Sequence, residues 1–452
     1  MRPTLQEIAA HLGHIRQLPS AAGWKACVDS RELRAGDLFI ALEGERQDGH
    51  AHVGAALDAG AAAVVAQPER VDEALRHNPR LLAVADSRQA LLELGAMARD
   101  RHSGPLVAIT GSNGKTTTKE VLAAILGGSR RVAASQGNQN STVGAPLSLL
   151  NGLDDHEIYV MEAGMSQPGE IARLCAMARP THGIITNIQP AHLEGTGGLD
   201  AVALEKGQLF RWLGLHNGVG IVNEDDPLVV VQAEHLRRRS AFSLRHHRVG
   251  GQTGMESLGV DEHARHLLRL SGHEVRLPVP GQAFLACAAA ACALALELGL
   301  EPAAIVKELA GFRGAPGRMA VRTMAGWTLL DDSYNANPAS MGAALRTLSQ
   351  FQAARRVAVL GEMRELGEDS LRLHRETGRL AAELALDQVW LVGSAQACAA
   401  FSQGLADGGS CATGQAASAT ELAALLTPRE GDAVLLKGSR LTGLDSLGRL
   451  WA

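Results

Sequence analysis

The stretch Leu106–Leu126, LVAITGSNGKTTTKEVLAAIL, decides how the rest of this chain is understood. It opens with a short apolar, partly β-branched run, which is typical of a buried strand, and glycine follows at once. From Lys115 onward the pattern favours an amphipathic helix. The N–H groups of such a glycine loop and the positive end of the following helix bind phosphate. Lys115 adds an ammonium, and Thr116 places a hydroxyl where Mg²⁺ would lie.

This loop, Gly111–Thr117, departs in one respect from the usual G-x-x-x-x-G-K-[ST] spacing. Ile109 stands where the first glycine belongs, so the loop is a shorter variant. A glycine-rich turn that merely ends a strand is one alternative, but strand, glycines, lysine, threonines and helix occur here in the required order. A GTPase is the other alternative. The chain has no N-K-x-D, which such proteins use to read guanine, so ATP is favoured.

Short apolar strands alternate with helical segments on both sides of this loop, which predicts parallel sheets covered by helices. The length of 452 residues exceeds what one hydrophobic core supports. We expect an α/β fold of three domains: a small N-terminal α/β domain (1–86), a central parallel-sheet ATP-binding domain (87–314) and a doubly wound C-terminal domain (315–452). The polar stretch 234–273 is expected as a peripheral insertion. The apolar run 284–296 is too short to cross a bilayer and is expected as a buried helix.

Composition narrows the choice of partners and compartment. The net charge is 43 − 48 = −5 with both signs scattered, so no basic stripe predicts nucleic acid or anionic lipid. The six cysteines show no C-x-x-C and the N-terminus lacks an unbroken apolar run, which favours a cytoplasmic protein without membrane insertion. Only 6 of the 43 basic residues are lysines, which suggests that each does something arginine does not: Lys25, Lys115, Lys119, Lys206, Lys307, Lys437.

Polar residues also follow the next predicted strands. Glu162 ends the strand IYVME, and Asn187 and His192 follow the strand GIITN. Ligands of open parallel sheets bind at such strand ends, so these residues favour a second Mg²⁺ site. Taken singly, each is more often a capping or solvated residue. Lys206 fits this site poorly, because an ammonium repels cations, and the residues alone favour an exposed helical lysine.

Longer motifs give the chain a recognisable resemblance. It carries DSRELRAGDLFIALEGERQDGH, TGSNGKTTTKE, GNQNSTVGAPLSLL, MEAGMSQPGEI, TNIQPAHLEGTGGLDAVALEKGQLF, DDSYNANPASM, LGEMRELG and LLKGSR. In these it resembles the Mur ligases of bacterial peptidoglycan synthesis over nearly its whole length. The resemblance implies a UDP-sugar-binding N-terminal domain, a central ATPase domain and a Rossmann-like C-terminal domain. It also implies an ATP-dependent amide ligase, with an acyl-phosphate intermediate, acting on UDP-N-acetylmuramoyl-tripeptide and D-alanyl-D-alanine. We expect a monomer.

The resemblance assigns roles residue by residue. It implies Lys115, His192 and Lys206 as catalytic residues, and Thr116, Glu162 and His192 as ligands of two Mg²⁺ ions. The nucleotide would be held by Gly111, Ser112, Asn113, Gly114, Lys115, Thr116, Thr117, Arg318 and Asp332. The other substrates would be contacted by Ser30, Arg31, Asn138, Asn187, Asn335 and Asn337. His192 as a general base is an alternative to its role as a ligand.

Two positions need separate comment within this resemblance: Lys206 and the segment that begins the expected helix 284–296. The resemblance implies that CO₂ carbamylates Lys206, which replaces the repelling ammonium with an anion that supports Mg²⁺. The family usually has G-x-H-N-x-x-N for adenine, whereas here Ala283, Phe284 and Cys287 replace the polar residues, and Ser141 stands where asparagine is usual. How adenine is held is therefore open, with Phe284 either stacking on the base or filling core.

Three classes of function remain open from the sequence. The first is the ligase that adds D-alanyl-D-alanine, and the second is an amide ligase of the same architecture that adds a different amino acid. The third is an ATP-binding regulatory protein without catalysis, for which the altered adenine segment is the motive. No motif shows whether the tripeptide ends in a diamino acid or lysine.

Overall fold

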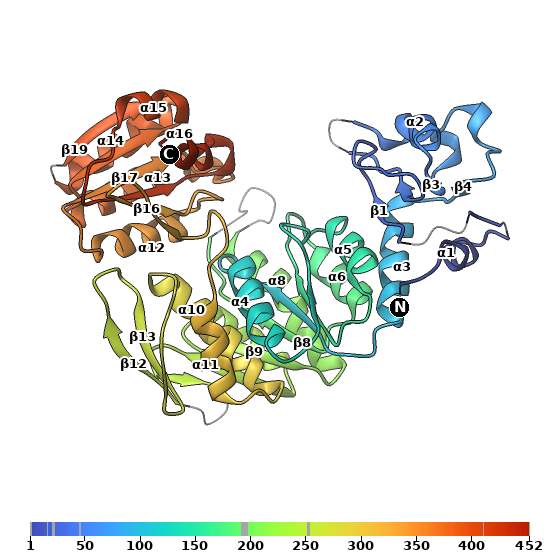
Figure 1. Cartoon of the computed structure of the whole chain (residues 1–452), viewed down its shortest axis with the longest axis horizontal. Coiled ribbons are helices and arrows are strands. Elements are labelled where there is room, and N and C mark those ends of the chain that lie inside the picture. Colours follow the sequence, from blue (N-terminus) through green and yellow to red (C-terminus); the bar gives the residue numbers. More distant parts are fainter. Residues whose placement is uncertain are drawn as a thin grey trace. The chain divides into compact units, whose positions relative to one another are not determined.

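A computed structural model describes residues 2–15, 17–19, 23–44, 47–190, 198–250, 254–409 and 411–451. The chain forms two compact units, and each is described by itself. Unit 1 comprises Met1–Ala108, Arg130–Met165 and Gly169–His182, and unit 2 comprises Ile109–Ser129, Ser166–Pro168 and Gly183–Ala452. The predicted α/β class is confirmed by three sheets with parallel cores (Figure 1). The domain boundaries at 86 and 314 stay a prediction.

The N-terminal region is a parallel four-stranded sheet in the order β1-β2-β3-β4. The short strand and the helix–strand pair expected here are confirmed as β2, α2 and β3. Its core packs Phe39 and Val64 against Val53 and Leu57 of α2. The elements are α1 (Leu5–His11), β1 (Ala26–Cys27), β2 (Leu38–Ile40), α2 (Val53–Asp58), β3 (Ala63–Ala66), β4 (Leu81–Ala83) and α3 (Ser87–Asp100).

The central sheet has seven strands in the order β11-β10-β9-β8-β5-β7-β6. The predicted alternation of strands and helices is confirmed throughout, and every residue of β5, β7 and β9 is buried. The elements are β5 (Leu106–Thr110), α4 (Lys115–Gly127), β6 (Val132–Ala134), α5 (Gly144–Gly152), β7 (Ile158–Glu162), α6 (Glu170–Ala178), β8 (His182–Ile185), α8 (Leu199–Leu215), β9 (Val219–Asn223), α9 (Pro227–Gln232), β10 (Arg238–Ser243) and β11 (Arg248–Val249).

The polar stretch 234–273 is only partly the peripheral insertion that the sequence predicts. Its first two strands, β10 and β11, join the central sheet, where β10 runs parallel to β9 and antiparallel to β11. A separate antiparallel sheet follows, made of β12 (Met255–Val260), β13 (His266–Leu270) and β14 (His273–Arg276). Polarity misled the prediction because the N-terminal end of β10 is exposed while Phe242 and Ser243 at its other end are buried.

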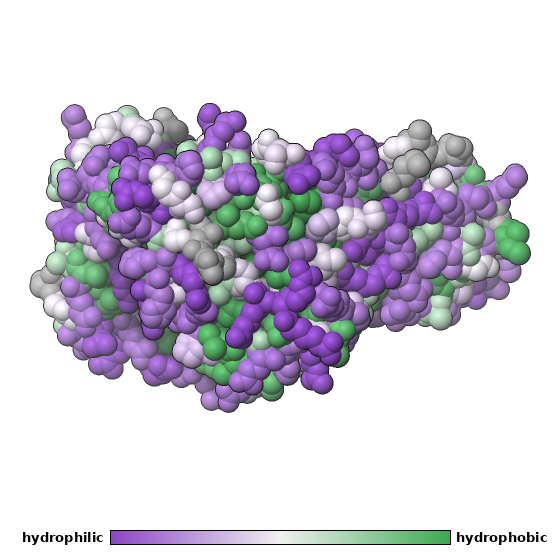
Figure 2. All heavy atoms as spheres, turned by 90° about the horizontal axis from the view of Figure 1, so that it is seen from below, coloured by the Kyte–Doolittle hydropathy of each residue, from purple (hydrophilic) through white to green (hydrophobic). Residues whose placement is uncertain are grey.

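Two helices complete the central region. The expected buried helix is α10 (Gln282–Glu297), which packs against α4, with α11 (Pro302–Gly311) beside them (Figure 1). Hydrophilic residues prevail on the face in Figure 2, where hydrophobic atoms occur in separate patches. Among the described helices, none combines the length and the apolar character that a membrane span needs.

The C-terminal sheet has the order β15-β16-β20-β17-β18-β19, with only β15 antiparallel to its neighbour. One of its cores also includes Ala264, which lies in the β12–β13 turn and is fully buried with Leu348 and Phe351. The elements are β15 (Ala320–Thr323), β16 (Thr328–Asp331), α12 (Pro338–Ser349), β17 (Arg355–Gly361), α13 (Ser370–Glu383), β18 (Gln388–Val392), α14 (Ala395–Gly408), β19 (Ala412–Ala416), α15 (Ala419–Leu425), β20 (Asp432–Lys437) and α16 (Leu447–Leu450).

Candidate nucleotide-binding site

The predicted phosphate loop connects β5 to α4, as the sequence indicates. Gly111 has φ +148°, and a side chain there would overlap the Thr186 hydroxyl. Gly114 has φ +81° and caps the start of α4, and a Cβ there would lie 2.8 Å from Cys287 Sγ. Both positions therefore need glycine, for conformation and for space. The resulting turn directs the positive N-terminal end of α4 toward the site.

The ammonium of Lys115 lies over its own loop. Its Nζ donates to the carbonyl oxygen of Gly111 at 2.8 Å and to that of Ser112 at 3.4 Å. Lys115 is half-buried. The loop thus holds the ammonium within reach of any anion that enters the turn.

The end of β8 fixes the loop through side chains that lie some 75 positions further along the sequence. Asn187 accepts from Ser112 N through its carbonyl oxygen and from Asn113 N through Oδ1, each at 3.0 Å. Its Nδ2 donates to the carbonyl oxygen of Asn113 at 3.2 Å, and the Thr186 hydroxyl donates to the same oxygen at 2.6 Å. Gln189 exchanges two hydrogen bonds with the Ser112 hydroxyl. Asn187 therefore holds the loop with both ends of its amide; its role as a substrate contact stays a prediction.

Two C-terminal residues reach this loop. Arg318 donates to Thr116 Oγ1 at 3.2 Å, and Asn337 Nδ2 donates to Asn113 Oδ1 at 2.7 Å. Asn337 is also the N-cap of α12, where it accepts from Ser340 N. The guanidinium of Arg318 lies 3.9 Å from the ring centre of Tyr334, which fixes its direction. The structure thus brings these two predicted residues together with the loop.

Asp332 is held in place by a buried lysine. Its Oδ2 lies 2.9 Å from the Nζ of Lys437, and its Oδ1 accepts from Met319 N at 3.1 Å. Lys437 also donates to the carbonyl oxygen of Asn335 at 2.6 Å, while the Asn335 side chain accepts from Ala336 N. Lys437 is therefore a positioning residue for the segment that carries Asp332 and Asn335.

Lys206 is not the exposed helical lysine that its residue type alone favours. It lies on α8 with 2% of its surface exposed. Burial, together with the nearby charge of Lys115, lowers the pKa of Lys206 to about 7. A sizeable share of this amine is therefore neutral near pH 7, which makes it a nucleophile.

Glu162 belongs to unit 1 and is described within it. It ends β7, is buried, and its Oε1 accepts from Asn140 Nδ2 at 2.8 Å. A buried carboxylate oxygen and the hydroxyl oxygen of Thr116 are both hard donors of the kind that Mg²⁺ prefers, so these residues fit the ion chemically. His192, the other predicted ligand, lies outside the described residues.

Three predicted substrate residues also lie in unit 1. Ser30 is half-buried, while Arg31 and Asn138 are exposed. Arg31 forms an ion pair of 2.6 Å with Asp29, which lowers the pKa of that carboxyl to about 2. These positions are open to a ligand from solution, and their roles stay predictions.

The start of α10 differs in character from the phosphate loop. Phe284 is buried and stacks on Phe312 at 5.8 Å between ring centres, so it fills core, as its residue type favours. Cys287 is buried and its thiol donates to the carbonyl oxygen of Gly114 at 3.6 Å. Ala283 is exposed and apolar. None of these three side chains offers an amide or an imidazole.

Several functional residues were missed by sequence reasoning. Thr186, Gln189 and Tyr334 carry no local signal, because their partners are distant in sequence. Lys437 had a signal, since it is one of six lysines in an arginine-rich chain. Like Lys119 and Lys206, it is buried.

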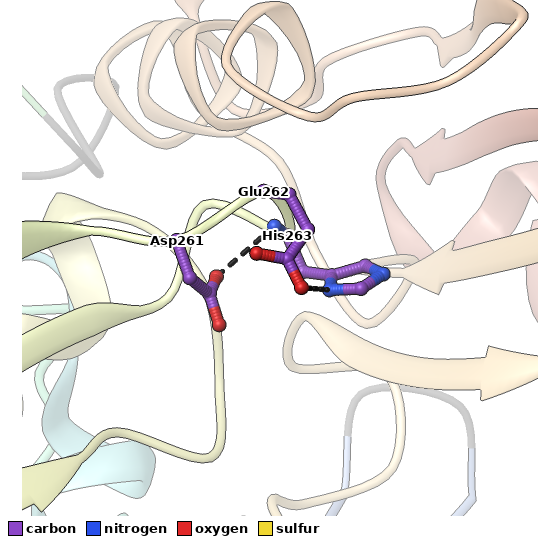
Figure 3. Close-up of side chains that lie close together, drawn as sticks. All are labelled: Asp261, Glu262 and His263. Atoms are coloured by element: carbon purple, nitrogen blue, oxygen red, sulfur yellow. Dashed lines mark hydrogen bonds and ion pairs between the residues drawn. The ribbon is translucent and has the colours of Figure 1, made fainter.

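A cluster outside this site brings together three potential metal ligands, Asp261, Glu262 and His263, in the β12–β13 turn (Figure 3). Asp261 already accepts from His263 N and forms ion pairs with Arg265 at 2.9 Å and with Arg276 at 3.7 Å. Two guanidinium groups therefore neutralise its charge, which disfavours a cation. The turn instead contacts the C-terminal sheet region, since Gln352 N donates to the carbonyl oxygen of Glu262 at 2.8 Å.

Comparisons with known proteins extend these observations. Three family models match: "Mur ligase family, catalytic domain" over residues 27–101, "Mur ligase middle domain" over 109–295 and "Mur ligase, glutamate ligase domain" over 317–440. The UDP-N-acetylmuramoyl-tripeptide–D-alanyl-D-alanine ligase of Escherichia coli K12 is 34% identical over 426 residues, covering 93% of this chain and 92% of that protein. The ligase of the same name from Mycobacterium tuberculosis H37Rv is 34% identical over 466 residues, covering 93% and 90%.

Two solved structures are similar to this chain over nearly its whole length. A crystal structure of MurF from Acinetobacter baumannii has a TM-score of 0.86 at 32% identity, covering 100% of this chain and 99% of that one. MurF from Thermotoga maritima, crystallised in complex with ADP, has a TM-score of 0.83 at 29% identity, covering 95% and 97%.

Proposed function

The chain belongs to the Mur ligase family, and from this premise we propose that it joins D-alanyl-D-alanine to UDP-N-acetylmuramoyl-tripeptide at the expense of ATP. The relatives that carry this activity in their names cover more than nine tenths of the chain. The single observation that supports it best is the phosphate loop, which Asn187 fixes from β8 and which Arg318 and Asn337 contact from the C-terminal side. We also propose a cytoplasmic monomer with domain boundaries at 86 and 314.

Joining a carboxylate to an amine is uphill in water, so the carboxylate is first activated. In the proposed reaction a carboxylate oxygen of the tripeptide attacks the γ-phosphorus of ATP, the bond to ADP breaks, and an acyl phosphate forms. The neutral amine of D-alanyl-D-alanine then attacks the acyl carbon, and the tetrahedral intermediate expels phosphate while the amine nitrogen loses its proton. No side chain of the protein bonds to substrate.

Positioning and charge neutralisation are what phosphoryl transfer requires of the protein. Lys115 and the N-terminal end of α4 would bind the phosphates, and Arg318 would approach them from beside Thr116. Thr116, Glu162 and His192 would hold Mg²⁺, which supplies charge neutralisation on the phosphate oxygens. Ser30 and Arg31 would contact the UDP group, and Asn138, Asn187, Asn335 and Asn337 the rest of the substrates.

Lys206 would act as a carbamate. Its pKa of about 7 leaves the neutral amine that can attack CO₂, and the product is a carbamate anion and a released proton. The anion would then lie where an ammonium would repel cations. The buried position of Lys206 protects such a carbamate from water.

A substrate comparison tests the activity. Purified protein is incubated with Mg·ATP, UDP-N-acetylmuramoyl-tripeptide and either D-alanyl-D-alanine or single amino acids, and phosphate release is measured. Release that requires the dipeptide is expected. Release with a single amino acid instead would assign another amide ligase, and no release under any condition would favour a regulatory ATP-binding protein.

A rescue experiment tests the carbamate. Lys206→Ala should lower turnover by about 10²–10³, the scale of one preorganised charge in an active site. Short carboxylates such as formate or acetate should restore part of this activity, while Lys206→Arg should not respond to them. Full activity of Lys206→Ala without any carboxylate would contradict the role.

A further inference from the structure

A fully buried histidine lies in the C-terminal sheet region, outside the residues to which the proposed reaction gives a role. His374 has 0% of its surface exposed and lies on α13. Its ring meets the ring of Phe401, on α14, edge-on, with 4.8 Å between the ring centres. Its two nitrogens connect it to a loop that leads to the candidate nucleotide site.

Both ring nitrogens of His374 are used. Nε2 accepts a hydrogen bond from Met363 N at 2.9 Å, and Nδ1 lies 2.6 Å from the carbonyl oxygen of Ser370. Since a carbonyl oxygen can only accept, Nδ1 carries the proton and Nε2 has none. Burial lowers the pKa of His374, which keeps the ring neutral near pH 7. The two contacts require this neutral form, because a proton on Nε2 would face the N–H of Met363.

The loop that follows β17, residues 361–366, is held from a second direction by the end of β20. β17 and β20 are parallel neighbours, so the loop and the residues after β20 leave the same edge of the sheet. Ser439 is buried, and its N donates to the carbonyl oxygen of Glu362 at 3.2 Å. Its hydroxyl oxygen accepts from Arg364 N at 3.0 Å. His374 and Ser439 therefore fix three successive residues of the loop.

Ser439 lies between two residues that contact the candidate nucleotide site. Two positions before it, the Nζ of Lys437 lies 2.9 Å from Oδ2 of Asp332. The next residue is Arg440, whose guanidinium lies 5.4 Å from the ring centre of Tyr334. The same ring also fixes the direction of the arginine that contacts the phosphate loop. A shift of Ser439 would therefore displace groups on both sides of it.

We infer that His374 is a positioning residue for the proposed ligation. Its neutral ring holds the loop at Met363, and the loop holds Ser439. Ser439 in turn sets the positions of Lys437 and Arg440 beside the nucleotide-binding residues. His374 acts only through these contacts, because it touches none of the groups proposed to react. The inference rests on the proposed function, since it concerns the rate of that reaction.

Two substitutions separate the hydrogen bond of the ring from the space that the ring fills. His374→Leu fills much of the space but offers no acceptor to Met363 N, so the nucleotide-binding residues should be misplaced and kcat should fall about tenfold. KM for the UDP-linked tripeptide should change less than about twofold, because its proposed UDP contacts lie in unit 1. His374→Gln offers an amide oxygen in place of Nε2, so kcat should stay within about threefold of the wild type.

Thr377→Val is the matched control. Thr377 is buried on the same helix, and its hydroxyl donates to the carbonyl oxygen of Leu373 at 2.8 Å, so the change removes a buried hydrogen bond within α13 itself. Urea unfolding should show a loss of stability in both Thr377→Val and His374→Leu. Only His374→Leu should lose kcat, measured as steady-state phosphate release at a temperature at which every variant is folded.

A double variant tests the connection through Ser439. Ser439→Ala removes the acceptor of Arg364 N and should lower kcat about fivefold. If both side chains act through the same loop, the variant that combines Ser439→Ala with His374→Leu should lose about as much as His374→Leu alone. Two independent effects would multiply instead.

Three results would overturn the inference while the wild type still ligates: a normal kcat in His374→Leu, equal losses in His374→Gln and His374→Leu, or losses that multiply in the double variant. Absence of ligation by the wild type would overturn the proposed function instead.

A measurement on the wild type keeps the inference testable if His374→Leu does not fold. Nitrogen-15 spectra of histidine-labelled protein report the protonation of each ring nitrogen, and His374→Gln assigns the signal. A protonated Nδ1 and a bare Nε2 are expected near pH 7. An imidazolium signal at this pH would overturn the inference.

Discussion

The phosphate loop and the start of α10 contact each other at Gly114 and Cys287, yet they are built in opposite ways. The loop is polar and is held by hydrogen bonds from Asn187, Gln189 and Thr186. The start of α10 is apolar, with Phe284 stacked into core and Cys287 buried. The loop must hold a fixed geometry to position phosphate groups, whereas the start of α10 only has to fill space beside the loop.

The contrast between a hydrogen-bonded loop and an apolar helix start predicts where the site tolerates substitution. A hydrogen-bonded loop loses a partner with every change, and an unpaired buried group costs about 1–3 kcal/mol. An apolar contact can exchange residues of similar size at smaller cost. We therefore expect variants of the loop to have large effects and variants at Cys287 to have small ones.

The largest effect is expected at Lys115. Lys115→Ala removes the only loop side chain that carries a full positive charge toward the phosphates, so turnover should fall by at least about 10³. The fold should remain, because the ammonium donates to the carbonyl oxygens of Gly111 and Ser112 in its own loop, and other groups hold that loop in place. Phosphate release and circular dichroism measure the two quantities. Ligation at the wild-type rate would show that the phosphate loop is not more sensitive to substitution than the start of α10.

A pH experiment at Lys206 comes next. Between about pH 7 and pH 10 the unfolded chain keeps the proton on this lysine while the folded chain releases it, so stability rises with pH across that window. Below pH 7 both states hold the proton, and the buried charge costs its full amount. Lys206→Met should therefore be more stable than the wild type by about 5 kcal/mol well below pH 7, with the gain vanishing toward pH 10.

Urea unfolding of both proteins at several pH values, in CO₂-free buffer, measures this difference. A stability gain that does not change between pH 6 and pH 10 would show that Lys206 is not desolvated in the folded protein.

Asn187 should show an intermediate effect. Asn187→Ala leaves Asn113 N without its acceptor and removes a donor to the Asn113 carbonyl, which should cost about 1–3 kcal/mol of stability and weaken ADP binding about tenfold. Asn187→Asp is the matched variant for stability, since it keeps the acceptor for Asn113 N and replaces the donor by a carboxylate oxygen. Its loss of stability should be smaller, whereas its negative charge should weaken ADP binding further. Equal losses of stability in the two variants would show that the acceptor at Asn187 does not fix the loop.

The smallest effect is expected at Cys287. Cys287→Ser keeps the size and the donor to Gly114, so KM for ATP should change less than about threefold and stability by about 1 kcal/mol or less. Steady-state kinetics and urea unfolding measure both. A tenfold rise in KM would show that the apolar side of the site is as constrained as the polar side.

The sequence predicts well those features that depend on neighbouring residues. The loop, α4, the central strands and the buried helix α10 follow from local patterns of glycine, lysine and apolar residues. The contacts of Thr186, Asn187 and Gln189 with the loop do not, because only the pairing of distant strands brings them together. Nor could the burial of Lys206 be predicted, since a lysine on a helix is usually solvated. The place of β10 in the sheet was hidden by its arginines, which lie on exposed positions.

One further consequence concerns the β12–β13 turn. Ala264 contributes a fully buried methyl group to the core of the C-terminal sheet region, and its carbonyl oxygen accepts from Gly281 N, one residue before α10. We therefore expect the small antiparallel sheet, the beginning of α10 and the C-terminal core to open together, so that their slowest amide protons report a common free energy of opening. Opening any one of the three would expose apolar surface in the other two, so we expect protease sensitivity to be lost or gained in all three together.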